Sequence, residues 1–297
     1  MKQFYEEPTF IVGMPRSGTT LIQGILCNTG KYFPIPETHF FSRVAYGLPE
    51  KLDQKARRYI LRVLMKKSRI RADELALAGI NTQKEAFEYV ISIFNTKNQS
   101  TFLEKTPRHV FFYSKILKYY PSAKFICMIR EPKNSVASQL TSSPVPNKSV
   151  TRLSFLYRKI AKAVINIQAM RNVFLIKYED LTTDQESIVS KICSFLNIPY
   201  NSKFIENVAA PAGIVSEHEF WKQNNIDQQT IKKNQTDKWR NVLSPYQAAI
   251  VNFITGPYAK EFGYSLSYKP VQLSYGLFGD IPKLISKREI KKLFSNI

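Results

Sequence analysis

The segment from Thr9 to Cys27 constrains the fold of this 297-residue chain most strongly. A continuous apolar run, Thr9-Phe-Ile-Val-Gly13, is followed by turn-forming residues and then by a helical pattern from Thr20 to Cys27. A run that is apolar at every position is typical of a strand covered on both faces, as in a parallel sheet. The segment therefore predicts a strand–loop–helix unit within an α/β fold.

Other parts of the chain repeat this pattern. Further strands are predicted at 125–129, at 173–176 and, more briefly, at 101–103, and helices at 51–78, 153–170 and 184–196. The predicted fold class is therefore α/β, with a central parallel sheet flanked by helices in three layers. We expect one domain at 1–269 and a basic C-terminal tail at 270–297, with a helix near 283–294.

The loop Gly13-Met-Pro-Arg-Ser-Gly-Thr-Thr20 lies between the first predicted strand and helix. Backbone N–H groups of such a loop, together with the helix N-terminus, can hold an anion. The spacing of its glycines matches a nucleotide-binding P-loop, but Thr19 stands where that motif has lysine. The absence of this lysine argues against an ordinary kinase or ATPase, which needs it to bind the transferred phosphate. Arg16, within the loop, can instead bind a terminal anionic group.

A second candidate element follows the strand at 125–129. This strand delivers Arg130 to the carboxyl edge of the sheet, where ligands of α/β proteins bind. Pro132 is expected to start a helix, and Ser138 lies roughly two turns along it. Arg130 and Ser138 could share a phosphate, although an arginine at a strand end is often only a surface ion-pair partner.

Charge and composition narrow the classes of partner. The chain has 43 Lys and Arg against 23 Asp and Glu, a net charge of +20 that favours an anionic partner, unless it reflects only a solvated lysine-rich surface. The basic stretch 51–71 and the tail admit contact with a membrane surface or an anionic acceptor. No apolar run reaches the roughly 20 residues that span a bilayer, so we expect a cytoplasmic protein. The three cysteines and three histidines are scattered, and we expect no metal site.

Several motifs together resemble one enzyme family. Pro15-Arg-Ser-Gly-Thr-Thr-Leu21 resembles the 5′-phosphosulfate loop of sulfotransferases that use 3′-phosphoadenosine 5′-phosphosulfate (PAPS), and Arg130 and Ser138 resemble the 3′-phosphate pair of that family. The further matches, in family order, are Pro36-Glu-Thr-His-Phe40, Glu104-Lys-Thr-Pro107, Tyr178-Glu-Asp-Leu181, Asp237-Lys-Trp-Arg240 and Gly263-Tyr264. Arginine in the loop is similar to bacterial and Golgi-type members, of which the bacterial type fits better.

The resemblance implies a P-loop-like α/β fold, PAPS as co-substrate, PAP (the corresponding 3′,5′-bisphosphate) as product, and no metal. It implies catalytic roles for Arg16, Glu37 and Lys105, of which Lys105 stabilises the leaving oxygen. His39, close to Glu37 in the sequence, is added to this catalytic group because of its own chemistry. The implied nucleotide-binding residues are Arg16, Ser17, Gly18, Thr19, Thr20, Arg130, Ser138, Tyr178, Lys238, Trp239 and Arg240. For Tyr178 and Trp239 the alternative is a packing role.

Two residues compete for the role of general base. The resemblance favours Glu37, whereas an unperturbed His39 would have the pKa nearer neutrality. Burial would raise the pKa of Glu37, and the neighbouring cations Arg16 and Lys105 would oppose that rise. We expect Glu37 to be the base and His39 to orient the acceptor or the loop.

The predicted reaction moves a sulfuryl group from PAPS to a hydroxyl or amine of a carbohydrate, a glycolipid or a polar natural product. One alternative is a small-molecule kinase of the P-loop class, which would need Mg²⁺ and ATP. The other is a basic nucleic-acid-binding protein, for which the chain has no recognised motif, so no nucleic-acid partner is expected. Neither the acceptor nor the oligomeric state follows from the sequence.

Overall fold

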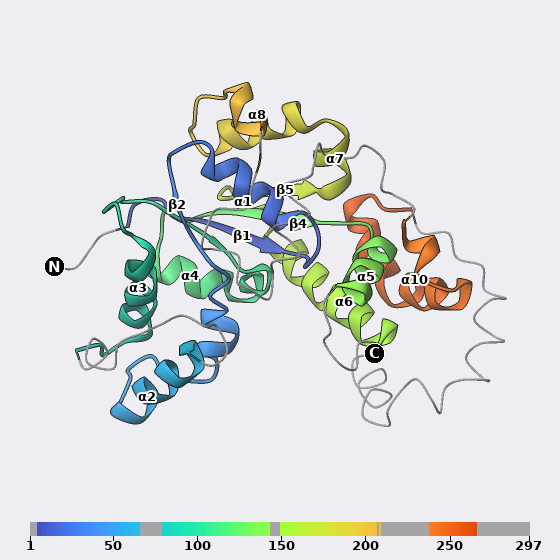
Figure 1. The fold of residues 1–297 in the computed structure, drawn as a ribbon. Coiled ribbons are helices and arrows are strands. Elements are labelled where there is room, and N and C mark those ends of the chain that lie inside the picture. Colours follow the sequence, from blue (N-terminus) through green and yellow to red (C-terminus); the bar gives the residue numbers. More distant parts are fainter. Residues whose placement is uncertain (1–4, 66–78, 143–148, 207, 209–237, 266–297) are drawn as a thin grey trace.

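Five parallel strands form the central sheet of the protein (Figure 1). The structure, a computed structural model, describes residues 5–65, 79–142, 149–206, 208 and 238–265. The strands lie side by side in the order β2-β3-β1-β4-β5. Their bounds are β1 Thr9–Gly13, β2 Phe33–Ile35, β3 Phe102–Lys105, β4 Lys124–Ile129 and β5 Val173–Lys177.

The continuous apolar runs are explained by burial on both faces of the sheet. Along β1, Phe10 and Val12 belong to one hydrophobic cluster and Ile11 to another, because successive side chains of a strand point to opposite faces. Along β4, Cys127 and Met128 divide between the same two clusters. The central strands therefore have no solvent-facing side, and a strictly alternating pattern would not have fitted them.

Helices cover both faces and complete a three-layer, P-loop-like α/β fold. In Figure 1, α1, α7 and α8 lie over one face, while α3, α4 and α6 lie over the other, with α5 and α10 beside α6. Residues of α1 and α8 form one core cluster with the sheet, and those of α3, α4 and α6 form the other. The helices are α1 Thr19–Cys27, α2 Gln54–Val63, α3 Gln83–Phe94, α4 Tyr113–Tyr119, α5 Pro132–Thr141, α6 Val150–Ile167, α7 Tyr178–Thr183, α8 Gln185–Phe195 and α10 Pro245–Ala259.

Short helical turns connect these elements. The ones that concern the site are a π-helical turn η1 (Phe40–Val44) and two 3-10 turns, η3 (Pro107–Phe112) and η6 (Lys238–Asn241). Two more 3-10 turns, η4 (Ser202–Ile205) and η7 (Lys260–Phe262), follow α8 and α10.

Most predicted elements within the described residues are confirmed. The helix after the loop is α1, the helices expected at 153–170 and 184–196 are α6 and α8, and Pro132 starts α5 with Ser138 inside it. The predicted helix at 51–78 begins only at Gln54, and its part from 66 to 78 lies outside the described residues, as does the tail at 270–297.

Two details of the sheet differ from the prediction. The strand β2 was not predicted, because it has only three residues and Pro34 lies in the middle. Proline is tolerated here because β2 is an edge strand of the sheet. The predicted strand at 101–103 is displaced, so that Lys105 is the last residue of β3 rather than a residue after it. Lys105 is held in the ladder opposite Ile11 of β1.

Within the described residues, none of the helices is long and apolar enough to cross a membrane. The same part of the chain contains no group of three or more His, Cys, Asp or Glu side chains placed to hold a metal ion.

Candidate active site

The candidate site residues gather at the carboxyl edge of the sheet. All five strands are parallel, so the segments that follow them meet at one edge. Glu37 follows β2, Lys105 ends β3, the loop with Arg16 follows β1, Arg130 follows β4 and Tyr178 follows β5. The strand order thus sets these residues in a row, with the loop in the middle.

The loop begins with a close approach that only glycine permits. Gly13 has φ 114°, and a Cβ atom there would lie 2.2 Å from the carbonyl oxygen of Met128 in β4. The next residue, Met14, donates its N–H to that same oxygen at 2.8 Å. The loop is therefore anchored on the neighbouring strand as it leaves the sheet.

The rest of the loop is shaped to present its backbone. Arg16 has φ 66°, in the left-handed region that an arginine seldom adopts, and the buried Ser17 donates its hydroxyl to the Met14 carbonyl at 2.5 Å. Gly18, with φ 82°, precedes α1 and provides no side-chain cap. The first N–H groups of α1, from Thr19 onward, are thus left without a side-chain cap.

The predicted Arg130–Ser138 pair contacts the loop directly. Arg16 donates from Nε to the hydroxyl oxygen of Ser138 at 3.3 Å, and Arg130 donates from Nη1 to the carbonyl oxygen of Arg16 at 2.8 Å. Residues more than 110 positions apart are therefore joined into one polar cluster. The cluster combines two guanidinium groups with a hydroxyl from the second half of α5.

Arg130 is the best-enclosed cation of this cluster. Its guanidinium lies 4.2 Å from the centre of the Tyr178 ring, and its backbone carbonyl accepts a hydrogen bond from the hydroxyl of Tyr157 at 2.9 Å. The residue is 8% exposed, and its Nε is buried without a hydrogen-bond partner. A buried N–H of a charged group that lacks a partner fits a site for an anion. Sequence reasoning did not identify Tyr157, which lies in the middle of α6.

Tyr178 lies against the loop. It is the first residue of α7, and its ring would be 2.8 Å from a Cβ atom placed on Gly18. The second glycine of the loop is therefore needed both for its backbone conformation and for the space that the tyrosine ring takes.

The segment Lys238–Arg240 packs on α5. The Trp239 ring lies between two cations, with Lys133 Nζ at 4.3 Å and the Arg240 guanidinium at 4.6 Å from its centre. The backbone N–H of Trp239 donates to Asn134 Oδ1 at 3.4 Å. Trp239 also packs on a small hydrophobic cluster that includes Val136, whereas Lys238 and Arg240 are exposed. The contribution of this segment to nucleotide binding stays a prediction.

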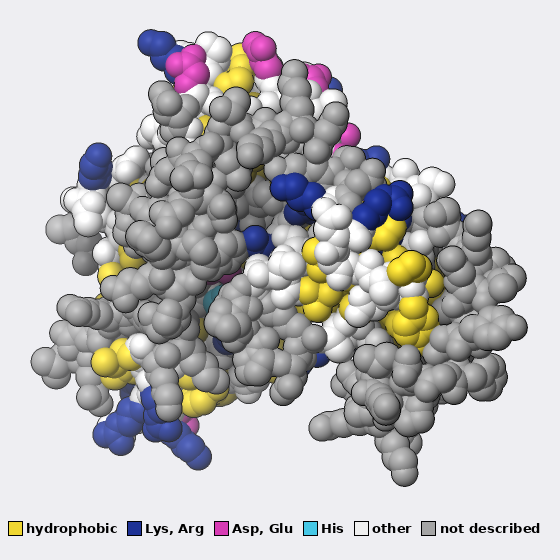
Figure 2. All heavy atoms as spheres, turned by 45° about the vertical axis from the view of Figure 1, so that its right-hand side comes forward, with side chains coloured by type: hydrophobic (Ala, Val, Ile, Leu, Met, Phe, Trp, Pro, Cys, Tyr) yellow, Lys and Arg dark blue, Asp and Glu magenta, His cyan; other side chains and the backbone are white. Residues whose placement is uncertain are grey.

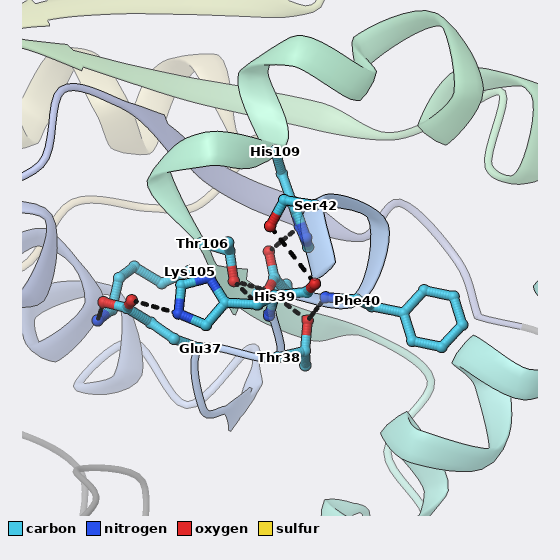
Figure 3. Close-up of polar contacts among 9 residues, drawn as sticks. Glu37, Thr38, His39, Phe40, Ser42, Lys105, Thr106 and His109 are labelled. Carbon is cyan, nitrogen blue, oxygen red and sulfur yellow. Dashed lines mark hydrogen bonds and ion pairs between the residues drawn. The ribbon is translucent and has the colours of Figure 1, made fainter. Parts of the chain in front are cut away.

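Glu37 contacts two of the three other predicted catalytic side chains, Lys105 and His39 (Figure 3). Lys105 Nζ lies 2.5 Å from Glu37 Oε1, and His39 Nε2 lies 3.4 Å from Glu37 Oε2. The Lys105 side chain is 4% exposed and the Glu37 side chain 19%. Figure 2 looks into a recess in which a histidine and an acidic side chain are visible beside basic ones. The carboxylate can thus be reached from solvent, whereas the lysine is held beneath it.

His39 has lost the near-neutral pKa that would have favoured it as the base. Burial lowers the pKa of His39 to about 4, the positive charge of Arg43 adds to this lowering, and Glu37 only partly opposes it. The imidazole is therefore neutral near pH 7 and is a weak base. His39 adopts φ 49° and precedes η1, so its backbone turns the chain away from the sheet edge.

A buried network behind Glu37 and Lys105 was not identified from the sequence. Glu104 is fully buried in β3, and its carboxylate accepts hydrogen bonds from the hydroxyls of Thr38 at 3.0 Å and Thr106 at 2.5 Å. His109 Nδ1 lies 3.0 Å from the second carboxylate oxygen. Thr38 is adjacent to Glu37, and Glu104 and Thr106 flank Lys105, so the network fixes both halves of the ion pair (Figure 3). The available signal was an acidic residue directly after the short strand predicted at 101–103.

Comparison with known proteins identifies the fold and the family. A family model described as "Sulfotransferase family" matches residues 8–202, more than half of the chain. The sulfotransferase domain of the olefin synthase from Synechococcus PCC 7002 superposes with a TM-score of 0.61 at 19% identity, covering 90% of this chain and 98% of that domain. The sulfotransferase domain from the curacin biosynthetic pathway gives 0.56 at 20% identity, covering 89% and 100%.

Two curated sequences also match parts of this chain. Protein-tyrosine sulfotransferase 1 from Danio rerio is 24% identical over 217 residues, which cover 70% of this chain and 58% of that protein. An uncharacterised protein from Aquifex aeolicus is 22% identical over 214 residues, which cover 68% of this chain and 27% of that protein. The matched regions thus span somewhat more than half of the Danio rerio protein and about a quarter of the Aquifex aeolicus protein.

Proposed function

The chain belongs to the sulfotransferase family, and we propose that it transfers a sulfuryl group from PAPS to a hydroxyl or amine of its acceptor. The acceptor classes we propose are a carbohydrate, a glycolipid or a polar natural product. The two sulfotransferase domains reported above, which come from an olefin synthase and the curacin biosynthetic pathway, are in keeping with the last class.

One observation carries the choice of donor: the contact between the loop and the Arg130–Ser138 pair. Two guanidinium groups, one hydroxyl and the uncapped start of α1 converge there, and Arg130 Nε is buried with no partner. An anion cradle and a separate enclosed arginine suit a ligand with two phosphate groups at some distance from each other. A 3′,5′-bisphosphate of adenosine has this character. Arg16, Ser17, Thr19 and Thr20 would hold its 5′ side, and Arg130 and Ser138 its 3′ side.

PAPS would supply the sulfuryl group, and this chain's residues would supply positioning and charge. In the proposed reaction Glu37 accepts the proton of the acceptor while the acceptor oxygen or nitrogen forms a bond to sulfur. The bond from sulfur to the bridging oxygen breaks, and Lys105 and Arg16 stabilise the negative charge left on that oxygen. Because Lys105 is bound to Glu37 in the free protein, it must loosen this ion pair to act on the leaving oxygen.

Nucleotide-dependent thermal stabilisation tests the donor. PAP without metal should raise the Tm of the protein more than ATP with Mg²⁺, because a ligand that binds only the native state stabilises it. Arg130→Ala should reduce this rise, whereas Lys55→Ala, at an exposed position of α2, should leave it unchanged. Equal stabilisation of both variants by PAP, or stronger stabilisation by ATP with Mg²⁺, would contradict the proposal. Labelled PAPS with a panel of acceptors would then identify the acceptor.

A further inference from the structure

Three arginines, Arg43, Arg108 and Arg152, lie near one another, and Arg108 also lies near Glu37. Arg43 belongs to η1, Arg108 to η3, and Arg152 to the first turn of α6. The turn η3 packs against both η1 and α6, so the three elements meet around Arg108. None of the three residues was singled out by the motifs that indicate the nucleotide site.

Their guanidinium groups have no partner within the described part of the chain. None of the three side chains makes an ion pair or a hydrogen bond with another described residue, although Arg108 is half-buried and only Arg43 and Arg152 are exposed. Arg57 of α2 differs from them, because it donates to the carbonyl oxygen of Ile80 at 3.0 Å.

The three charges act on one another and on Glu37. Burial lowers the pKa of Arg108, the charges of Arg43 and Arg152 lower it further, and Glu37 acts in the opposite direction. Arg43 acts in the same way on His39, the neighbour of Glu37. The three arginines therefore form a positively charged cluster near the candidate base.

A half-buried guanidinium between two others is electrostatically unfavourable in the free protein. Such a cluster becomes favourable when an anion binds, since guanidinium groups pair with carboxylates and phosphates through two parallel hydrogen bonds. The nucleotide's own phosphates are provided for at the loop and at Arg130, on the other side of Lys105 in the strand order. Since no carboxylate of the described residues pairs with this cluster, we assign its anion to the other substrate.

We propose that Arg43, Arg108 and Arg152 form a subsite for an anionic group of the acceptor, which places the acceptor's hydroxyl or amine at Glu37. This inference rests on the proposed function and deepens it: the acceptor carries a carboxylate or a phosphate or sulfate ester near the group that is sulfated. A neutral acceptor would leave the three charges unpaired, so the subsite also selects against neutral analogues.

The test uses the PAP-saturated full chain, so that the nucleotide's anion sites are filled. Inorganic phosphate and malonate serve as probes of the tetrahedral and the carboxylate anion, with chloride keeping the ionic strength constant. Either probe, well above its dissociation constant, should raise the Tm by about 2–4 °C. Arg108→Gln and Arg152→Gln should lose most of that rise, and Arg108→Lys, which keeps the charge but not the planar fork, should keep part of it. Lys55→Gln on α2 should respond like the wild type.

A rise in Tm with phosphate alone would identify the anionic group of the acceptor as a phosphate or sulfate ester. A rise with malonate alone would identify it as a carboxylate. The proposal is wrong if neither anion raises the Tm of the wild type, or if Arg108→Gln and Arg152→Gln keep the full rise. The two proposals can fail separately. If PAP does not stabilise the protein but phosphate or malonate does so through Arg108 and Arg152, the donor is wrong and the subsite stands. If PAP stabilises the protein and the arginine variants respond normally, only the subsite is wrong.

Discussion

The ion pair between Glu37 and Lys105 can be tested with a double-mutant cycle. Lys105→Met keeps most of the side-chain volume and removes the cation, and Glu37→Gln keeps the shape and removes the charge. The Lys105 side chain is 4% exposed and lies 2.5 Å from Glu37, so either single change leaves the remaining partner enclosed without its counter-charge.

The structure sets the expected magnitude. Removing one partner of a fully buried pair costs about 3–5 kcal/mol of stability. Glu37 is 19% exposed and retains His39 at 3.4 Å, so Lys105→Met should lower the free energy of unfolding by a smaller amount, about 2–3 kcal/mol. Adding Glu37→Gln removes the stranded carboxylate. The double variant should therefore be more stable than Lys105→Met alone, with a coupling energy of about 1–2 kcal/mol.

Urea unfolding of the four proteins measures this coupling, and turnover of PAPS measures its catalytic counterpart. Glu37→Gln should lower kcat roughly 10²–10⁴-fold. Lys105→Met should lower kcat with little change in PAPS affinity. The fall in kcat of the double variant should be smaller than the product of the falls in the two single variants, because the two residues act as a unit. Strictly additive losses of stability would refute the ion pair. A proportional loss of affinity and rate in Lys105→Met would make Lys105 an anchor of the bound nucleotide instead.

Three further expectations follow from features of the site. Arg130→Ala should weaken PAP binding about ten- to a hundredfold by calorimetry, because a charge-assisted hydrogen bond is lost; unchanged affinity would remove Arg130 from the site. Gly13→Ala should cost about 2–5 kcal/mol in urea unfolding, since its Cβ would collide with the Met128 backbone at a positive φ, whereas Gly30→Ala, also at positive φ but with nothing within 4 Å, should cost only about 1 kcal/mol. Burial lowers the pKa of His39 to about 4, so between pH 6.5 and 4 His39 is neutral in the folded protein but protonated in the unfolded chain. Its contribution to the free energy of unfolding is therefore fully present above pH 6.5 and is lost as the pH falls toward 4. Between pH 7 and pH 4.5 this loss should be about 2–3 kcal/mol, and His39→Gln should lack it; an equal pH dependence in the variant would contradict the assignment.

The parts of the fold that the sequence predicted are those with a strong local pattern. The strands β1, β4 and β5 each contain a continuous apolar run, and the turn after β4 has Pro132 at a helix start, so each was identifiable without long-range information. The strand β2 could not be identified in the same way. Its three residues include a proline, and only its place at the edge, beside β3, makes it a strand.

In the candidate site, too, features with a strong local pattern were predicted, and features that depend on tertiary packing were not. The loop and the Arg130–Ser138 pair were predicted from spacing, but their direct contact depends on the strand order, which no local pattern contains. The Glu104 network illustrates the limit further. A glutamate in a strand becomes a buried acceptor only when Thr38 and His109, from two other segments, are packed against it. The lowered pKa of His39 has the same origin in tertiary burial.

The central position of β1 has a consequence for how the chain is made. This strand leaves the ribosome before both of its neighbours in the sheet, β3 and β4, and Arg130, just after β4, follows Arg16 by 114 residues. At roughly 5–20 residues per second, about 6–23 s of synthesis separate the loop from the arginine that contacts it. During that interval a largely apolar strand has both edges unpaired, a state prone to wrong pairing and aggregation. The nascent chain should therefore depend on chaperones until Arg130 and Tyr178 have emerged, and PAP should not be able to rescue it before then.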